Sequence, residues 1–178
     1  MNVRIVNISM RNLDDIPSPC RSCIYWEFPD LFGKVSGAEA FFHKKKWFIK
    51  ALREFGVCGK ILYIDEVSCG YAQFAPYHML PQTRACGDHQ DKDNVLFLSC
   101  LFICKAEYRG IGLGSRLLKS IILDVKARGF SRIETIARRD SANNPSGPLE
   151  FYLKNGFEIK RELNQNFVLA MLDLKMIR

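Results

Sequence analysis

The chain has 178 residues, of which 48% are hydrophobic and 25% are charged, and it carries a formal net charge of +7. This composition is typical of one soluble globular domain, and it excludes a disordered chain. The basic balance favours anionic ligands, which include a phosphorylated cofactor, a nucleic acid and an acidic substrate.

No apolar stretch reaches the roughly 18 residues that a membrane-spanning helix needs, and the N-terminus lacks the apolar region of a signal peptide. We therefore expect a cytoplasmic protein with no membrane association. The seven cysteines are an odd number, and several lie in apolar segments, so reduced thiols are expected rather than an obligatory disulfide.

In the N-terminal half, Val3–Ser9 predicts a first strand, and a short helical turn is expected at Asn12–Ile16. A helix is predicted over Ala38–Phe55, because Ser36 and Glu39 have the spacing of a capping box. The apolar stripe of this helix is expected at Phe41, Phe48, Leu52 and Phe55. Its solvated face is expected to hold Lys44, Lys45, Lys46 and Lys50.

Two β-rich runs, Cys58–Ile64 and Ser68–Ala75, lie close enough in sequence to require an antiparallel hairpin. A loop and an apolar strand, Val95–Cys104, follow. The remaining elements are a helix from about Gly112, a strand at Phe130–Ala137, a short helix at Pro148–Asn155, and a hairpin of Phe157–Leu163 and Phe167–Leu174. Because a helix joins Val95–Cys104 to Phe130–Ala137, these two strands should be parallel.

The segment Arg109–Gly114, with the sequence Arg-Gly-Ile-Gly-Leu-Gly, joins the apolar strand to the long helix. Three glycines in five positions remove Cβ atoms from the turn, so backbone N–H groups can converge on a ligand at the positive end of the helix. This arrangement favours a phosphate or pyrophosphate ligand.

The same segment resembles motif A of the GCN5-related N-acetyltransferase (GNAT) superfamily, Gln/Arg-x-x-Gly-x-Gly/Ala. Leu149–Phe157 resembles motif B of that family, since Tyr152 precedes a Gly-Phe pair by four positions. The resemblance implies an α/β (α+β) fold in one domain, residues 1–178. Its mixed sheet of about seven strands would be flanked by about four helices and splayed between the fourth and fifth strands. A variable acceptor-side half would span about 1–92 and an acetyl-CoA-binding half about 93–178.

Acetyl-CoA is the co-substrate that the resemblance implies, and no metal is required. The pantetheine arm would lie along the edge of the apolar strand and the pyrophosphate in the glycine turn, with an asparagine of the following loop near the pantetheine. The implied cofactor-binding residues are Leu101, Ile103, Cys104, Arg109, Gly110, Ile111, Gly112, Leu113, Gly114, Ser115, Asn144 and Tyr152.

The implied reaction is the direct attack of a primary amine on the thioester in a ternary complex. Tyr152 matches the family tyrosine that protonates the leaving thiolate, and a strand N–H near Leu101–Cys104 would stabilise the oxyanion. The apolar strand carries no carboxylate, so the base stays open: Glu134 is the candidate, with Glu66 and Glu27 as alternatives that would also act through water. The acceptor side is expected to include Tyr25, Trp26, Glu27 and Glu66.

Other readings are less well supported by the sequence. A Rossmann site needs a glycine where Ser115 stands, and a P-loop needs Gly-Lys-Ser/Thr where Gly114-Ser115-Arg116 stands. Cys20-x-x-Cys23 has no second pair to complete a zinc site. The lysine run of the first helix has no accompanying nucleic-acid motif.

The predicted function is therefore N-acetyl transfer to a small-molecule or peptide amine. The alternative is a non-catalytic module that binds acyl-CoA or an anionic partner. The sequence also leaves a homodimer open.

Overall fold

The computed structural model describes residues 1–86, 94–140 and 147–177. Its centre is a seven-stranded sheet in the order β1-β2-β3-β4-β5-β7-β6, in which β4 and β5 are parallel and all other neighbours are antiparallel. The strands are β1 (Val3–Asn7), β2 (Gly59–Ile64), β3 (Val67–Pro76), β4 (Val95–Ile103), β5 (Arg132–Arg138), β6 (Glu158–Glu162) and β7 (Phe167–Asp173). The predicted seven-stranded mixed sheet is confirmed.

Three α-helices occur among the described residues, beside five short 3₁₀ segments. The α-helices are α1 (Gly37–Glu54), α2 (Leu113–Ala127) and α3 (Leu149–Lys154). The 3₁₀ segments are Leu13–Asp15, Cys20–Ser22, Tyr77–Met79, Pro81–Cys86 and Ala106–Tyr108. None of the helices in the described part of the chain combines the length and apolar character that a membrane span requires.

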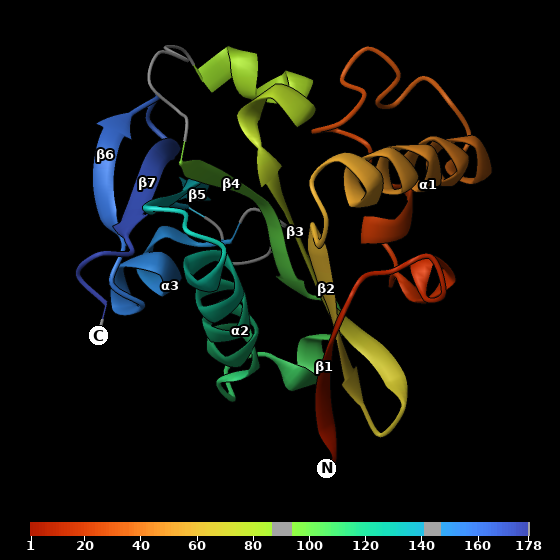
Figure 1. Ribbon diagram of the computed structural model, residues 1–178, viewed down its shortest axis with the longest axis horizontal. Helices are drawn as coiled ribbons and strands as arrows, with labels where there is room; N and C mark the ends of the chain where they lie inside the picture. The colour runs from red at the N-terminus through yellow and green to blue at the C-terminus, as the bar shows by residue number, and fades with distance from the viewer. Residues whose placement is uncertain (87–93, 141–146, 178) are drawn as a thin grey trace.

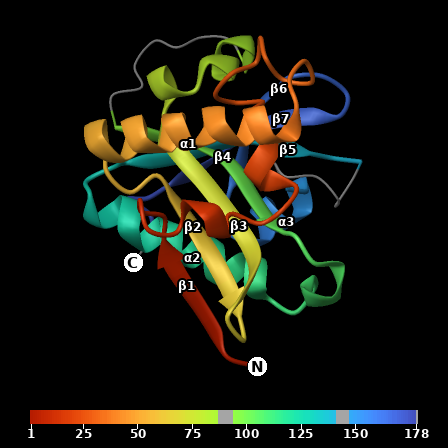
Figure 2. The ribbon, with the colours of Figure 1, turned by 90° about the vertical axis from the view of Figure 1, so that its right-hand side faces the viewer.

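The helices cover opposite faces of the sheet, with α2 and α3 on one face and α1 on the other (Figures 1 and 2). One apolar cluster contains the inner side of α2 together with Leu149 and Tyr152. A second cluster joins Trp47 and Phe48 of α1 to Tyr71 of β3 and to the loop before α1. Each face of the sheet therefore has its own core.

A β-bulge in β4 changes which residues face each core. The register between β3 and β4 shifts where Gln73 pairs with Cys100 and Phe74 pairs with Leu98, so Ser99 is the extra residue. Leu98 and Leu101 consequently both lie in the α2 core, although three positions separate them. A bulge of this kind re-aims side chains and is common near functional sites.

The pairing of β4 with β5 is short. It runs from Val95↔Arg132 to Phe97↔Glu134, and the Thr135 hydroxyl then donates to the Leu98 carbonyl at 2.8 Å. Beyond this point, among the described residues, β4 continues to Ile103 beside β3 alone, while β5 continues beside β7. The predicted splay between the fourth and fifth strands is therefore present.

The first long helix differs from its prediction in one respect. Ser36 caps α1 as predicted, since its hydroxyl accepts from the Glu39 N–H at 3.2 Å. Lys44, however, was expected on the solvated face and is 3% exposed. That expectation is wrong, because Lys44 pairs with a buried carboxylate of the preceding loop, Glu27. Helical periodicity alone gives no signal for such a partner.

We predict that Ser36→Ala lowers the free energy of unfolding by about 1 kcal/mol, because a helix N–H loses its acceptor. Ser36→Asp should keep nearly full stability, since aspartate also caps helices well. Urea unfolding measures both variants. An equal loss in the two variants would show that the cap is not the cause.

Candidate functional site

The glycine turn has the backbone that its sequence predicts. Gly110 and Gly112 have φ angles of 77° and 86°, a region that residues with a Cβ atom rarely enter. No heavy atom lies within 4 Å of a Cβ built on either residue. At Gly114 a Cβ would meet the Phe151 ring at 3.2 Å, so this glycine lets the start of α2 approach α3. The turn is shaped by conformation at two glycines and by close packing at the third.

Arg109 ties the turn to the end of β4. Its Nε donates to the Ile103 carbonyl at 2.8 Å, and its Nη2 reaches the Cys104 carbonyl at 3.3 Å. The guanidinium also lies 4.8 Å from the centroid of the Phe102 ring. The cation of the motif therefore anchors the strand end and sets the position of the turn.

A pocket of about 460 Å³ lies between the end of β4, the glycine turn and α3. Its lining includes seven of the residues predicted to bind the cofactor: Leu101, Ile103, Arg109, Gly110, Gly112, Gly114 and Ser115. Four predicted residues among those described do not line it: Leu113 and Tyr152 are buried in the α2 core, Ile111 is 54% exposed, and Cys104 is partly buried against the core on the α1 face. Asn144 lies outside the described residues.

The sequence interpretation missed part of this pocket. The additional lining residues are Phe102, Tyr108, Gly147, Pro148, Glu150, Phe151 and Lys154. Glu150, Phe151 and Lys154 share one face of α3, so helical spacing around motif B could have indicated them. Residues of the turn before α3 left no comparable signal.

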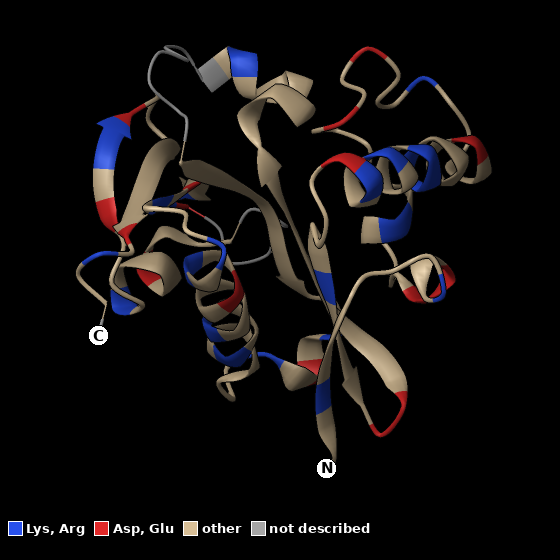
Figure 3. Cartoon of the chain, in the orientation of Figure 1, with Lys and Arg blue, Asp and Glu red and all other residues tan. Residues whose placement is uncertain are grey.

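A second pocket of about 870 Å³ lies beside the first, between α2, the start of β6, β7 and the C-terminal segment. Ser115 lines both pockets, so they meet at the start of α2. Arg116 and Lys119 of α2 line the second pocket, together with Glu158 and Asp173. Figure 3 shows several basic positions along α2. Together the two pockets suit a long, partly apolar ligand with anionic groups.

Tyr152 lies beneath the first pocket and is completely buried. Its ring contacts Phe151 and Phe157, and a Cβ built on Gly147 would lie 3.1 Å from its hydroxyl. Burial raises the pKa of Tyr152 above the ordinary tyrosine value, and a hydrogen bond with Thr135 opposes that shift in part. Since Thr135 also bonds Leu98, the phenol lies where β4 and β5 separate.

Glu134 is buried on β5 and is held by cations and a phenol. The Tyr77 hydroxyl donates to its Oε2, and Lys160 Nζ donates to its Oε1 at 2.6 Å. Arg132 lies 3.8 Å from the same oxygen. The carboxylate therefore has a donor at each oxygen.

Three of the four predicted acceptor-side residues lie together on the α1 face. Trp26 is buried against Phe97 of β4, Tyr25 is 38% exposed, and Glu27 is 3% exposed. Glu66 lies instead at the tip of the β2–β3 hairpin, where it is exposed and paired with Arg4 at 2.7 Å. The structure does not bring Glu66 into this group.

Three thiols also meet on the α1 face. Cys20 is hydrogen bonded to Cys100 and Cys104, and the bond with Cys100 together with burial raises the pKa of Cys20 well above its usual value. All six cysteines whose side chains the structure describes are free thiols. Among the described residues no group of three or more His, Cys, Asp or Glu side chains is arranged to hold a metal ion.

Comparisons with known proteins agree with this geometry. A family model described as the acetyltransferase (GNAT) domain matches residues 60–159, which is more than half of the chain. The protein therefore belongs to the GNAT acetyltransferase family. A comparison with curated proteins gave no match.

Solved structures share the fold at low sequence identity. YncA from Salmonella typhimurium, a putative acetyltransferase solved with acetyl-CoA, is 14% identical, with a TM-score of 0.67, over 98% of this chain and 95% of that chain. PaiA N-acetyltransferase from Thermoplasma acidophilum, solved with coenzyme A, is 15% identical, with a TM-score of 0.65, over 97% and 99%. An N-acetyltransferase from Staphylococcus aureus Mu50 is 20% identical, with a TM-score of 0.58, over 98% and 99%.

We predict that Lys44→Met lowers the free energy of unfolding by about 3–5 kcal/mol, because it leaves the Glu27 carboxylate buried without its cation. The double variant Glu27→Leu/Lys44→Met should regain most of this loss, since apolar replacements of buried pairs are often neutral. Lys50→Met, on the exposed side of α1, is the control. Denaturant unfolding tests the set, and a double variant no more stable than Lys44→Met would contradict the prediction.

Proposed function

We propose that the protein transfers an acetyl group from acetyl-CoA to a primary amine by direct attack in a ternary complex. The observation that carries this proposal is the open edge of β4, which leads into a glycine turn at the start of α2. A strand edge and a helix N-terminus suit the two chemically different parts of CoA, which are the amide-containing pantetheine arm and the pyrophosphate.

The edge of β4 offers backbone groups for the pantetheine arm. The Cys104 N–H donates to the Cys69 carbonyl of β3 at 2.7 Å. Because successive N–H groups of a strand point to opposite edges, those of Ile103 and Leu101 point toward the gap. We assign one of them to hydrogen bonding with pantetheine and the other to the thioester oxygen, where a fixed donor stabilises developing negative charge.

The turn and the start of α2 fit the pyrophosphate. Gly110 and Gly112 leave open space where Cβ atoms would project, so phosphate oxygens can approach the backbone N–H groups closely. The helix dipole favours an anion at this end, and Ser115 can add a hydroxyl. Arg116 and Lys119 border the adjoining pocket and suit the remaining phosphate of the nucleotide.

The chemistry requires a neutral amine, a stabilised oxyanion and a proton for the departing thiolate. The amine nitrogen forms a bond to the carbonyl carbon, the C–S bond breaks, and one proton leaves the nitrogen while another reaches sulfur. We assign Tyr152 as the donor to sulfur. Its raised pKa keeps the phenol protonated, and its position below the β4–β5 gap suits a thiolate at the end of the pantetheine arm.

For Glu134 we propose an electrostatic role beside the reacting groups. Its carboxylate already accepts hydrogen bonds from Tyr77 and Lys160. Its negative charge can therefore stabilise a positive charge near the gap, while its oxygens are occupied and less suited to accept a proton. Residues 1–92, which include Trp26 and Glu27, would bind the amine of a small molecule or peptide, and residues 93–178 would bind acetyl-CoA.

A module that binds CoA without turnover is the second candidate, because β4 carries no carboxylate between Val95 and Ile103. A free-thiol assay with acetyl-CoA and a panel of amines separates the two candidates. The panel contains a peptide with a free α-amino group, a lysine peptide, spermidine and an aminoglycoside. Thiol release supports catalysis, whereas CoA binding without release from any amine supports the module.

We predict that Gly112→Ala weakens acetyl-CoA binding at least tenfold, because a Cβ strains the left-handed backbone that aims the turn. Gly129→Ala is a matched control: Gly129 has a φ of 85°, lies just past the other end of α2, and also has no neighbour within 4 Å of its Cβ position. Calorimetric titration measures both variants. Equal weakening in the two would argue against a role of the turn in binding, and the absence of binding by the unmodified protein would overturn the proposed function.

We predict that Tyr152→Phe lowers kcat about 100-fold, the usual scale for losing a general acid, with acetyl-CoA affinity unchanged. Because burial raises the pKa of Tyr152, its proton is retained below about pH 10. The activity of the unmodified enzyme should therefore not fall as the pH rises toward that value. A variant with full kcat, or a loss of activity already at mildly alkaline pH, would remove Tyr152 from this role.

A further inference from the structure

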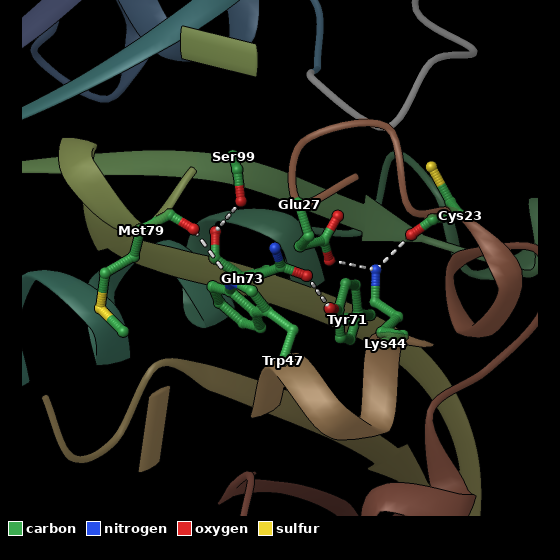
Figure 4. Close-up of polar contacts among 8 residues, drawn as sticks. All are labelled: Cys23, Glu27, Lys44, Trp47, Tyr71, Gln73, Met79 and Ser99. Atoms are coloured by element: carbon green, nitrogen blue, oxygen red, sulfur yellow. Dashed lines mark hydrogen bonds and ion pairs between the residues drawn. The ribbon is translucent and has the colours of Figure 1, made fainter. Parts of the chain in front are cut away.

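A buried ion pair lies on the α1 face of the sheet, next to the bulge of β4. Lys44 Nζ is 2.9 Å from Glu27 Oε1, and the two side chains are 3% and 1% exposed. The ammonium also donates to the Cys23 carbonyl and lies 5.5 Å from the centroid of the Tyr71 ring. Figure 4 shows this arrangement. Lys44 is therefore fixed by partners besides Glu27.

The carboxylate of the pair is less well satisfied than the ammonium. Oε1 has Lys44 as its partner, whereas Oε2 has neither a hydrogen-bond donor nor an ion-pair partner among the described residues. A buried charge is costly unless it is both paired and hydrogen bonded. Apolar residues would fill this position at lower cost if stability alone were at stake.

Gln73 of β3 presents a complementary buried group. Its Oε1 accepts from the Tyr71 hydroxyl and its carbonyl accepts from the Ser99 hydroxyl at 3.0 Å, but its Nε2 has no partner among the described residues. Tyr71 links the two groups: its hydroxyl donates to Gln73, and Lys44, the partner of Glu27, lies 5.5 Å from the centroid of its ring. Figure 4 shows Glu27, Lys44, Tyr71 and Gln73 together. An unused acceptor and an unused donor thus belong to the same cluster.

The position of these groups relates them to the proposed transfer. Gln73 pairs with Cys100 at the bulge, two residues beyond Leu98, where the β4–β5 gap begins. Tyr152 lies on the other face of the sheet, in the α2 core. An acceptor amine that enters from the Glu27 side and a thioester whose sulfur lies toward Tyr152 would therefore meet in the gap beside β4.

Resting on the proposed function, we propose that Glu27 receives the proton released by the acceptor amine, and that Gln73 Nε2 positions the amine or an intervening water. The nitrogen gives its proton to Glu27 as the N–C bond forms, and Tyr152 gives its proton to sulfur as the C–S bond breaks. Solvent exchange then returns Glu27 to the carboxylate and Tyr152 to the phenol. Lys44 acts as a positioning residue that holds Glu27 in place.

Glu134 is the competing carboxylate, and its contacts differ in kind. Each Glu134 oxygen accepts a hydrogen bond, one from Tyr77 and one from Lys160, whereas Glu27 Oε2 accepts none from the described residues. The groups around the Glu27–Lys44 pair are Cys23, Cys100 and Tyr71, and none of these brings a second cation to the carboxylate. Glu27 therefore keeps a lone pair for an incoming N–H.

The test measures thiol release from acetyl-CoA with the amine panel and with n-butylamine as an unbranched probe. Glu27→Gln should lower kcat about 100-fold while the acetyl-CoA affinity stays within twofold. Gln73→Leu should raise the KM of the amine about tenfold. Glu54→Gln, at the exposed end of the same helix as Lys44, is the control and should leave the activity unchanged.

Chemical rescue separates a proton-accepting role from a structural one. Formate added to Glu27→Ala should restore part of the lost kcat, because a small carboxylate can occupy the vacated space. Thermal unfolding and acetyl-CoA titration establish whether each variant is folded. If both Glu27 variants unfold, the KM of Gln73→Leu for the amine decides the outcome. A Glu27→Gln variant with normal kcat, or a Gln73→Leu variant with normal KM, would overturn this inference alone. No thiol release by the unmodified protein would overturn the proposed function.

Discussion

The site depends on how early the hydrogen bonding between β4 and β5 ends. Parallel neighbours in a sheet normally continue side by side, but here the β4–β5 pairing ends at Phe97 and Glu134, while β5 is paired with β7 along its whole length and β4 stays with β3. The Thr135–Leu98 contact closes the inner end of the gap. From that point the edge of β4 is unpaired by any other strand in the described part of the chain, and such an edge is costly unless a ligand or water completes its hydrogen bonds.

The bulge at Ser99 determines which side chains of β4 lie on each face of the sheet. It keeps Leu98 and Leu101 in the α2 core while Phe97 and Cys100 face α1. Groups suited to opposite ends of a group transfer can then approach one strand from opposite sides, with a phenol on one face and a carboxylate with a carboxamide on the other. The two separate cores supply the stability that offsets the polar groups buried between them.

The strength of the sequence prediction varied with the range of the interactions involved. The sheet, the cap at Ser36 and the glycine turn follow from local patterns, and the structure contains all three. Lys44 was placed wrongly because its partner Glu27 is 17 residues away in a loop without periodicity. Glu66 was grouped with Glu27 on residue type alone, and only the fold separates a hairpin tip from the interior. The bulge also left no sequence signal, since Ser99 fits an ordinary strand.

The two outer strands of the sheet have a further consequence for the behaviour of the protein in solution. All five residues of β6 are exposed, and Lys160, Arg161 and Glu162 follow one another along it. At the opposite edge, β1 carries Arg4, which is exposed and paired with Glu66. Charged side chains on an edge strand oppose the addition of a strand from another molecule. The sheet can therefore keep one internal edge open for a ligand while its two outer edges resist aggregation.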